Sequence, residues 1–267
     1  MIARNDNKIA RYKGRPAEII PPVYSNSGGI ITYDGDYKIH TFNVSDNFIV
    51  YNAVDASALA VGGGSGVARA YYDIDISTYF NSGGGGGGHL VENYNLHIPA
   101  GIYKITVGIG GALGDYGKYG GSGSNSSIEG LLDASGAYVS TGEIDPCIGK
   151  GIISANGYNG GSYTFRILGG STISRVISGG GGGDSEIGTD GRYYYDDGQY
   201  WVGGNGGAGT LSKINNEWYG GGGGGVGIAG GIDGSGLIGG GSHGDWWIDS
   251  NEPSGNSGVV IIRYKYK

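Results

Sequence analysis

The stretch FNSGGGGGGHLVE (residues 80–92) decides the fold of this chain, because six consecutive glycines run directly into an apolar, strand-like segment. Glycine makes up 63 of the 267 residues, and further runs lie at 62–64, 179–183, 220–225 and 239–241. A glycine run loses more conformational entropy on folding than any other sequence, so it stays flexible unless a specific structure orders it. Dense aromatic blocks such as YYYDDGQYWV (residues 193–202) interrupt the runs, which is not typical of a linker.

Polyglycine can be ordered as a left-handed helix of three residues per turn, which has no internal hydrogen bonds and directs every backbone N–H and C=O outward. Several such helices side by side satisfy one another, and only glycine permits so close an approach. At about 3.1 Å per residue, a six-residue run spans about 19 Å. The runs therefore predict a bundle of short parallel rods, a polyglycine II helix bundle, with connecting loops at both ends. Collagen is excluded because glycine does not occupy every third position and only 6 prolines are present.

The segments outside the runs show the two-residue alternation of β-strands. Residues 30–44 predict a hairpin around Asp34-Gly35, a dipeptide that is typical of tight hairpin turns. Residues 259–266 predict a closing strand with Val260, Ile262, Tyr264 and Tyr266 on one face. Helical periodicity is almost absent; residues 126–134 (SSIEGLLDA) are expected to form one or two helical turns.

These patterns predict an all-β fold, in which glycine helices are inserted between the strands of a small antiparallel β-sandwich. We expect this glycine-rich domain to span residues 30–267. Residues 1–29, with Pro21-Pro22 and a Ser-Gly-rich hinge, are expected to form an extended N-terminal attachment arm.

Charge and cysteine content narrow the class of protein. The net charge is −7, yet residues 1–15 carry five basic residues against one aspartate. Five charges spread over fifteen residues are a weak signal for a nucleic-acid-binding tail, and docking onto a larger protein assembly or plain solvation is favoured. The single Cys147 allows no disulfide within the chain. We expect no signal peptide at the N-terminus and no membrane insertion, because no apolar segment has the required length.

The order of five segments makes the chain similar to a known family. They are VDASALAVGGG (54–64), GGGGGGHLVE (83–92), IPAGIYKITVGIGG (98–111), GGSGSNSSIEG (120–130) and GNSGVVIIRYKYK (255–267). Together they resemble the glycine-rich domain of phage and other virus structural proteins, which also occurs in the extracellular region of some receptor tyrosine kinases. The resemblance covers roughly residues 36–267 and implies a jelly-roll-like sandwich that carries a layer of polyglycine II helices. A similar helix bundle occurs in distal tail-fibre adhesins of some large tailed phages, where loops at the end of the bundle contact the host receptor.

Aromatic clusters in the connections between glycine runs are the leading candidates for a binding site. Tyr and Trp supply rigid, amphipathic contact area at small entropic cost, and their flat faces suit sugar rings. The alternative is that these rings cap the bundle or pack against the sandwich. Adjacent pairs favour binding, because two neighbouring rings rarely both find core positions. The expected receptor-binding residues are Tyr193, Tyr194, Tyr200, Trp201, Trp246 and Trp247.

Signals for catalysis, cofactors or metals are weak. Gly204, Gly206 and Gly209 match a dinucleotide fingerprint, which occurs by chance in so glycine-rich a chain and has no helix after it. Asp73 and Asp75 would share a strand face and could bind Ca²⁺, although a polar sheet face is the favoured interpretation. The four histidines, His40, His89, His97 and His243, show no metal-ligand spacing. We therefore expect no enzyme activity, no cofactor and no bound metal.

Two functional hypotheses remain. In the first, the chain is a phage virion adhesin of the tail fibre or tail tip, made in the host cytoplasm. Its arm docks onto other virion structural proteins, and its aromatic loops bind a host-surface glycan or outer-membrane protein. In the second, it is a structural or decoration protein, such as a head fibre, neck or collar component, whose bundle is a rigid spacer. The oligomeric state is open, and a homotrimer is one expectation.

Overall fold

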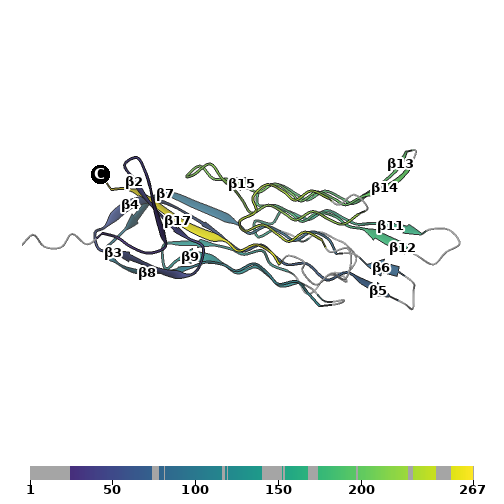
Figure 1. The fold of residues 1–267 in the computed structure, drawn as a ribbon, viewed down its shortest axis with the longest axis horizontal. Coiled ribbons are helices and arrows are strands. Elements are labelled where there is room, and N and C mark those ends of the chain that lie inside the picture. Colours follow the sequence, from purple (N-terminus) through teal and green to yellow (C-terminus); the bar gives the residue numbers. More distant parts are fainter. Residues whose placement is uncertain are drawn as a thin grey trace, which may run out of the picture.

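The computed structural model describes residues 25–73, 78–80, 82–115, 118, 120–139, 152, 154–167, 174–196, 198–227, 231–244 and 254–266. Within them the chain forms β-strands and no helix, so no helix that could cross a membrane is present there. The molecule is long, with one group of strands at one end and short hairpins at the other (Figure 1). Wavy glycine-rich segments connect the two ends.

Nine strands form the two main sheets. The five-stranded sheet has the order β1-β2-β17-β4-β7 and the four-stranded sheet the order β10-β9-β8-β3, and all their pairings are antiparallel. The prediction of an all-β, antiparallel structure is confirmed for these sheets. Their strands are β1 (Ile30–Asp34), β2 (Tyr37–Phe42), β3 (Asp46–Val50), β4 (Val54–Val61), β7 (Leu90–Ile98), β8 (Gly101–Thr106), β9 (Ser126–Ile128), β10 (Leu132–Ala134) and β17 (Val259–Lys265).

The main hydrophobic core lies between these two sheets. Phe42 and Ile262 from the larger sheet belong to one buried cluster with Phe48, Ile105 and Ile128 from the smaller one. The larger sheet also carries apolar residues on its other face. Those residues form a second cluster with Tyr219 from a hairpin of β15 (Thr210–Leu211) and β16 (Trp218–Tyr219). The closing strand β17 therefore contributes to both clusters, as its apolar residues on both faces predict.

Two sequence expectations meet different outcomes in this region. The hairpin at Asp34-Gly35 is confirmed, with a left-handed φ of 56° at Gly35. The expectation of helical turns at residues 126–134 is wrong, because β9 and β10 form an antiparallel hairpin there. Gly130, with φ 71°, makes the turn, and Ile128 and Ala134 are buried on one face. Residues 126–128 and 132–134 each follow the two-residue period of a β-strand, and the turn at 129–131 separates them.

Residues 25–29, which the sequence assigns to the arm, lie against the sandwich. Ser27 and Ile49 exchange backbone hydrogen bonds at 3.0 and 2.8 Å. The ammonium group of Lys38, which is buried on the core face of β2, donates to the hydroxyl of Ser25 at 2.8 Å and to the carbonyl of Asn26. Burial lowers the pKa of Lys38. The chain preceding Ser25 lies outside the described residues.

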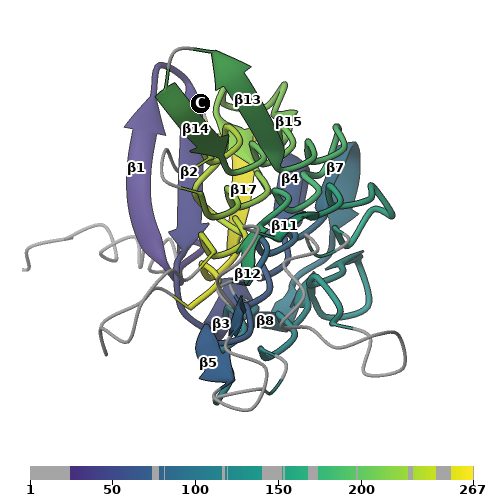
Figure 2. The ribbon, with the colours of Figure 1, turned by 90° about the vertical axis from the view of Figure 1, so that its right-hand side faces the viewer.

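The glycine runs are neither strands nor helices, and their backbone hydrogen bonds repeat every three residues. In the run 83–88, the N–H groups of Gly84 and Gly87 donate to the segment 179–182, and those of Gly85 and Gly88 donate to the segment 239–242. The four N–H to O=C pairs are Gly84 to Gly179, Gly87 to Gly182, Gly85 to Ser242 and Gly88 to Gly239, at 2.7–3.0 Å. The same spacing recurs between other segments, for example Gly222 to Gly207 and Gly225 to Gly204. Each run thus contacts several neighbours in rotation (Figure 2).

Runs that are buried on every side consist of glycine alone, whereas runs with an exposed side carry other residues at the exposed positions. The runs 83–88 and 220–225 consist of glycine alone and are buried throughout. In GGNGGAG (203–209), every third residue is not glycine, and Asn205 is exposed while the flanking glycines are largely buried. In GIDGS (231–235), glycine remains only at positions 231 and 234. An added Cβ at either glycine would lie 1.9–2.0 Å from a carbonyl oxygen of 203–209.

Replacement of an interior glycine by alanine should therefore lower the free energy of unfolding. In Gly84→Ala, the new Cβ would lie 1.9 Å from the carbonyl oxygen of Gly223, which the bundle holds on all sides. We expect a loss of about 3 kcal/mol or more in the free energy of unfolding, measured by denaturant titration. The matched control is Gly101→Ala in β8, where the nearest atom is a Tyr103 ring carbon at 3.5 Å. That variant should change stability by no more than about 0.5 kcal/mol. Equal effects of the two substitutions would contradict this account of the bundle.

Candidate functional site at the distal end

Three pairs of short strands lie at the end of the molecule away from the two main sheets, called here the distal end (Figure 1). One sheet has the order β11-β12-β6-β5, and its β12 and β6 pair in parallel. The hairpin of β13 and β14 extends beside it. The described chain begins at Ser25 and ends at Tyr266 at the opposite, sandwich end. These strands are β5 (Tyr71–Asp73), β6 (Thr78–Phe80), β11 (Thr164–Ile167), β12 (Ser174–Ile177), β13 (Arg192–Asp196) and β14 (Gly198–Val202).

The β13–β14 hairpin carries four of the six predicted receptor-binding residues. Its register places Tyr193 opposite Trp201 and Tyr194 opposite Tyr200. The hairpin therefore gathers these aromatic residues into two adjacent cross-strand pairs. Trp201 is only 7% exposed, so its indole offers little surface to a partner. Tyr193 is partly buried.

The other two predicted residues, Trp246 and Trp247, lie outside the described residues. Asp75, one half of the possible Ca²⁺ pair, does so as well, while Asp73 ends strand β5. In the described part of the chain, no group of three or more His, Cys, Asp or Glu residues is placed to hold a metal ion.

Trp218, which is adjacent to Tyr219 in the sequence, is at the base of the bundle and not at its distal end. Its side chain is 45% exposed and lies opposite Leu211 across the β15–β16 hairpin. Tyr219 is 2% exposed and packs on the larger sheet, and its hydroxyl accepts a hydrogen bond from the Asn215 amide at 2.7 Å. Of two adjacent aromatic residues, one is thus core and one is surface.

The dinucleotide-like fingerprint at Gly204, Gly206 and Gly209 has a structural explanation. These residues belong to a rod with two buried faces, and added Cβ atoms there would lie 1.8–2.0 Å from backbone oxygens of neighbouring rods. The N–H groups of all three glycines donate to carbonyl groups of the chain itself. No N–H of these glycines is therefore available to hold a phosphate.

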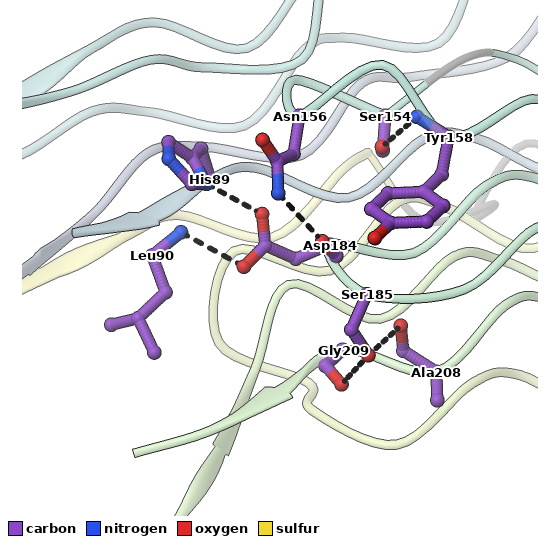
Figure 3. Close-up of polar contacts among 9 residues, drawn as sticks. All are labelled: His89, Leu90, Ser154, Asn156, Tyr158, Asp184, Ser185, Ala208 and Gly209. Atoms are coloured by element: carbon purple, nitrogen blue, oxygen red, sulfur yellow. Dashed lines mark hydrogen bonds and ion pairs between the residues drawn. The ribbon is translucent and has the colours of Figure 1, made fainter. Parts of the chain in front are cut away.

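A buried carboxylate joins the rods to the base of the bundle (Figure 3). Asp184 follows the run 179–183 and is 1% exposed. Its carboxylate accepts hydrogen bonds from the His89 ring at 2.7 Å and from the Leu90 N–H at 3.2 Å. Its backbone carbonyl accepts a further bond from the Asn156 amide at 3.0 Å. The hydrogen bond that His89 donates to Asp184 raises the pKa of His89, and this effect outweighs the opposing effect of burial.

The remaining histidines have comparable structural partners. In one rod contact, His243 donates to Asp233 at 2.8 Å. Burial opposes ionisation of Asp233, but its hydrogen bonds from His243 and the Gly224 N–H hold its pKa below the usual value. His97 pairs with Asp55 on the open surface of the larger sheet.

His40 is fully buried in the sandwich. Its ring N–H donates to the Gly28 carbonyl at 2.8 Å, and the other ring nitrogen accepts from the Tyr264 hydroxyl at 3.1 Å. Burial lowers the pKa of His40, with a further contribution from the charge of Lys38 and an opposing one from the bond to Gly28. The described histidines are thus accounted for by structural contacts.

The chain matches a known protein family. The model of a family described as a glycine-rich domain matches residues 41–265. The chain belongs to the glycine-rich domain family. The match covers the four-stranded sheet, all the glycine runs and the five-stranded sheet apart from β1 and most of β2, so the predicted resemblance to a glycine-rich domain is confirmed. A search of curated proteins finds no match.

The His89–Asp184 pair predicts a pH-dependent contribution to stability. Because the folded-state pKa of His89 is raised, the contribution is fully present below the unfolded value, about 6.5. It is lost as the pH rises through the folded-state pKa. His89→Gln should therefore reduce the free energy of unfolding more at pH 6 than at pH 9, as measured by urea titration.

The control for this prediction is His97→Gln, which removes a pair whose two side chains are 64% and 86% exposed. Exposed pairs contribute little to stability, so this variant should differ little from the parent chain at either pH. A deficit of His89→Gln that is identical at pH 6 and pH 9 would show that the charge on His89 is not involved.

Proposed function

We propose that the chain is a phage virion protein, an adhesin of the tail fibre or tail tip that recognises a host-surface receptor by binding and not by catalysis. The observation that carries the proposal is the placement of an aromatic hairpin, β13–β14, at the end of the molecule farthest from the sandwich. The receptor would be a glycan or an outer-membrane protein on the host cell. Tyr194, Tyr200, Trp246 and Trp247 would contact it directly, with Tyr193 at the margin.

The glycine runs fit this role as a rigid spacer, and we infer that they are polyglycine II helices. The three-residue repeat of their hydrogen bonds supports this assignment, because that helix has three residues per turn. A jelly-roll-like sandwich at the base follows from the family resemblance and agrees with the two packed sheets. A bundle tied by backbone bonds along its length would present the distal hairpins in a fixed orientation. Such preorganisation lowers the entropic cost of binding.

The sandwich end is suited to attachment to another virion structural protein. The edge strand β1 is exposed at all five positions, with Ile30 at 58% and Tyr33 at 60%. The opposite edge, β7, carries polar residues and a bulge opposite Ala56–Ala58, which are typical protections against strand addition. An apolar edge without such protection, next to the point where the N-terminal arm ends, favours docking there. Neither nucleic acid nor membrane insertion enters this proposal, and a homotrimer remains one possible assembly.

The alternative function is that of a structural or decoration protein, for example a head fibre, neck or collar component. The burial of Trp201 favours it, because at that position the aromatic residue packs within the molecule. In that case the bundle would be a spacer and the remaining distal aromatics would form subunit contacts. Localisation in the virion is common to both proposals.

Binding to intact cells of candidate host bacteria tests the adhesin. The full chain should bind, and the double variant Tyr194→Ser, Tyr200→Ser should lose about tenfold or more in affinity. Removal of a Tyr hot spot typically costs about 2 kcal/mol or more. Trp246→Ser, Trp247→Ser should act in the same direction. Trp201 is left unchanged, because its truncation would open a cavity in the fold.

The matched control is Trp218→Ser, which removes an exposed aromatic residue at the base of the bundle. It should leave cell binding unchanged, and thermal unfolding should show that every variant is folded. Failure of the parent chain to bind any candidate host, together with incorporation of the chain into virions, would refute the adhesin and support the structural alternative.

A further inference from the structure

The outer face of the four-stranded sheet contains a hollow of about 680 Å³. This volume falls within the range of about 300–1,000 Å³ that is usual for small-molecule sites. The hollow lies on the sandwich, away from the distal hairpins. Strands β8, β9 and β10 form its floor, and the β9–β10 turn forms one wall. It is lined by Lys104, Thr106, Asn125, Ser127, Ile128, Glu129, Gly130, Leu131, Leu132 and Asp133.

Strand register aligns three oxygen-bearing side chains across the floor. Thr106 pairs with Ser127, which pairs in turn with Asp133 on the next strand. Because side chains alternate along a strand, this row faces outward while neighbours such as Ile105 and Ala134 face the core. Two hydroxyl groups and one carboxylate are therefore presented in a line.

The wall of the hollow is held in place by backbone contacts. The N–H of Glu129 donates to the carbonyl of Lys104 at 3.0 Å, and the N–H of Leu131 donates to the carbonyl of Ile128 at 2.9 Å. On the opposite side, the side-chain oxygen of Asn125 accepts from the Gly136 N–H at 3.1 Å. These contacts fix the turn, so the hollow is formed before any ligand arrives.

The lining of the hollow also includes an apolar side chain. Leu131, in the β9–β10 turn, lines the hollow and is partly buried. Leu132 pairs with the buried Ile128 and faces the core, so only its backbone side borders the hollow. The Leu131 side chain can pack against a C–H face, while the neighbouring polar groups remain available to hydroxyl groups. A solvated sheet face alone would explain the polar row, but it would not explain a turn that brings a leucine beside it.

The charges of the lining define the class of ligand. Lys104 is the single cation, and Glu129 and Asp133 are the two anions. A phosphate or a nucleic acid would require an excess of positive charge. The oxygen ligands of a hard cation would have to share the hollow with the lysine ammonium group, which disfavours a metal. Mixed donors and acceptors of nearly balanced charge match the hydroxyl groups of a neutral sugar.

We propose that this hollow binds a neutral saccharide. Asp133 accepts hydrogen bonds from sugar hydroxyls, Ser127 and Thr106 donate or accept them, Lys104 donates from the side, and Leu131 contacts the ring. The site is separate from the distal hairpins, and it would give the chain a second point of contact with a polysaccharide surface.

The experiment is a titration of the isotope-labelled full chain, followed by amide NMR shifts. The probes are chitotriose, maltotriose and mannotriose as neutral saccharides and sialyllactose as an acidic one. At least one neutral probe should shift the amides of Ser127, Gly130 and Asp133, whereas sialyllactose should not. Ser127→Ala, Asp133→Ala should weaken binding of that probe about tenfold, since hydrogen bonds to a charged group are among the stronger ones.

The control variant is Thr32→Ala, an exposed position on β1 of the other sheet, and it should bind as the parent chain does. Absence of any shift with the three neutral probes overturns the proposal. Shifts confined to the β13–β14 hairpin would overturn it as well, while supporting recognition at the distal end. Equal binding of sialyllactose would contradict the charge argument. Failure of cell adhesion has no bearing on this titration, so the two proposals are tested separately.

Discussion

The structure depends on hydrogen bonds between the backbones of neighbouring glycine rods. Gly84 shows the constraint: it donates to Gly179 at 3.0 Å, and an added Cβ would meet the carbonyl of Gly223 at 1.9 Å. At such distances no side chain fits between these rods, so most of their cohesion comes from backbone groups. Each buried N–H must find an acceptor, because an unsatisfied buried group is costly. Most of these acceptors are carbonyls, and a few are side-chain oxygens such as that of Ser65, which accepts from the Gly86 N–H. The three-residue rotation of partners meets this requirement for a rod with several neighbours.

The sandwich sets the register of these rods. Several rods continue a strand directly: Gly62 follows β4, Gly108 lies just beyond β8, and Gly258 precedes β17. The hydrophobic core fixes the strands, and the strands fix the starting points of the rods. Asp184 adds a second restraint, because its carboxylate ties the end of one rod to His89 and Leu90 at the start of β7. Apolar packing at one end thus orients a bundle that has hardly any apolar side chains of its own.

The separation of a packed sandwich from a glycine bundle fits the proposed function, in which the distal hairpins bind a receptor far from the point of attachment. The interior of the bundle is mostly glycine, and exposed side chains occur at outward positions such as Asn205. In the distal hairpins Trp201 is itself buried, so only the exposed positions there could be changed without disturbing the packing. The hollow beside Asp133 belongs to the sandwich instead, where strand register and not the bundle positions the side chains.

The sequence by itself determined that the chain is β-structured, that the glycine runs are ordered, and that Asp34-Gly35 makes a hairpin, because local periodicity and the steric freedom of glycine are properties of short segments. It also pointed to residues 193–202, whose adjacent aromatics form a hairpin. Only the tertiary structure decided which rods are neighbours, that residues 126–134 form a hairpin, and that Trp201 is buried while Trp218 is exposed. The choice of rod neighbours and the burial of each aromatic residue depend on which segments, far apart in the chain, come to lie side by side, and no local pattern encodes that choice. The hairpin at 126–134 is local, but its pairing with β8 and the burial of Ile128 against the core favour strands over helical turns there.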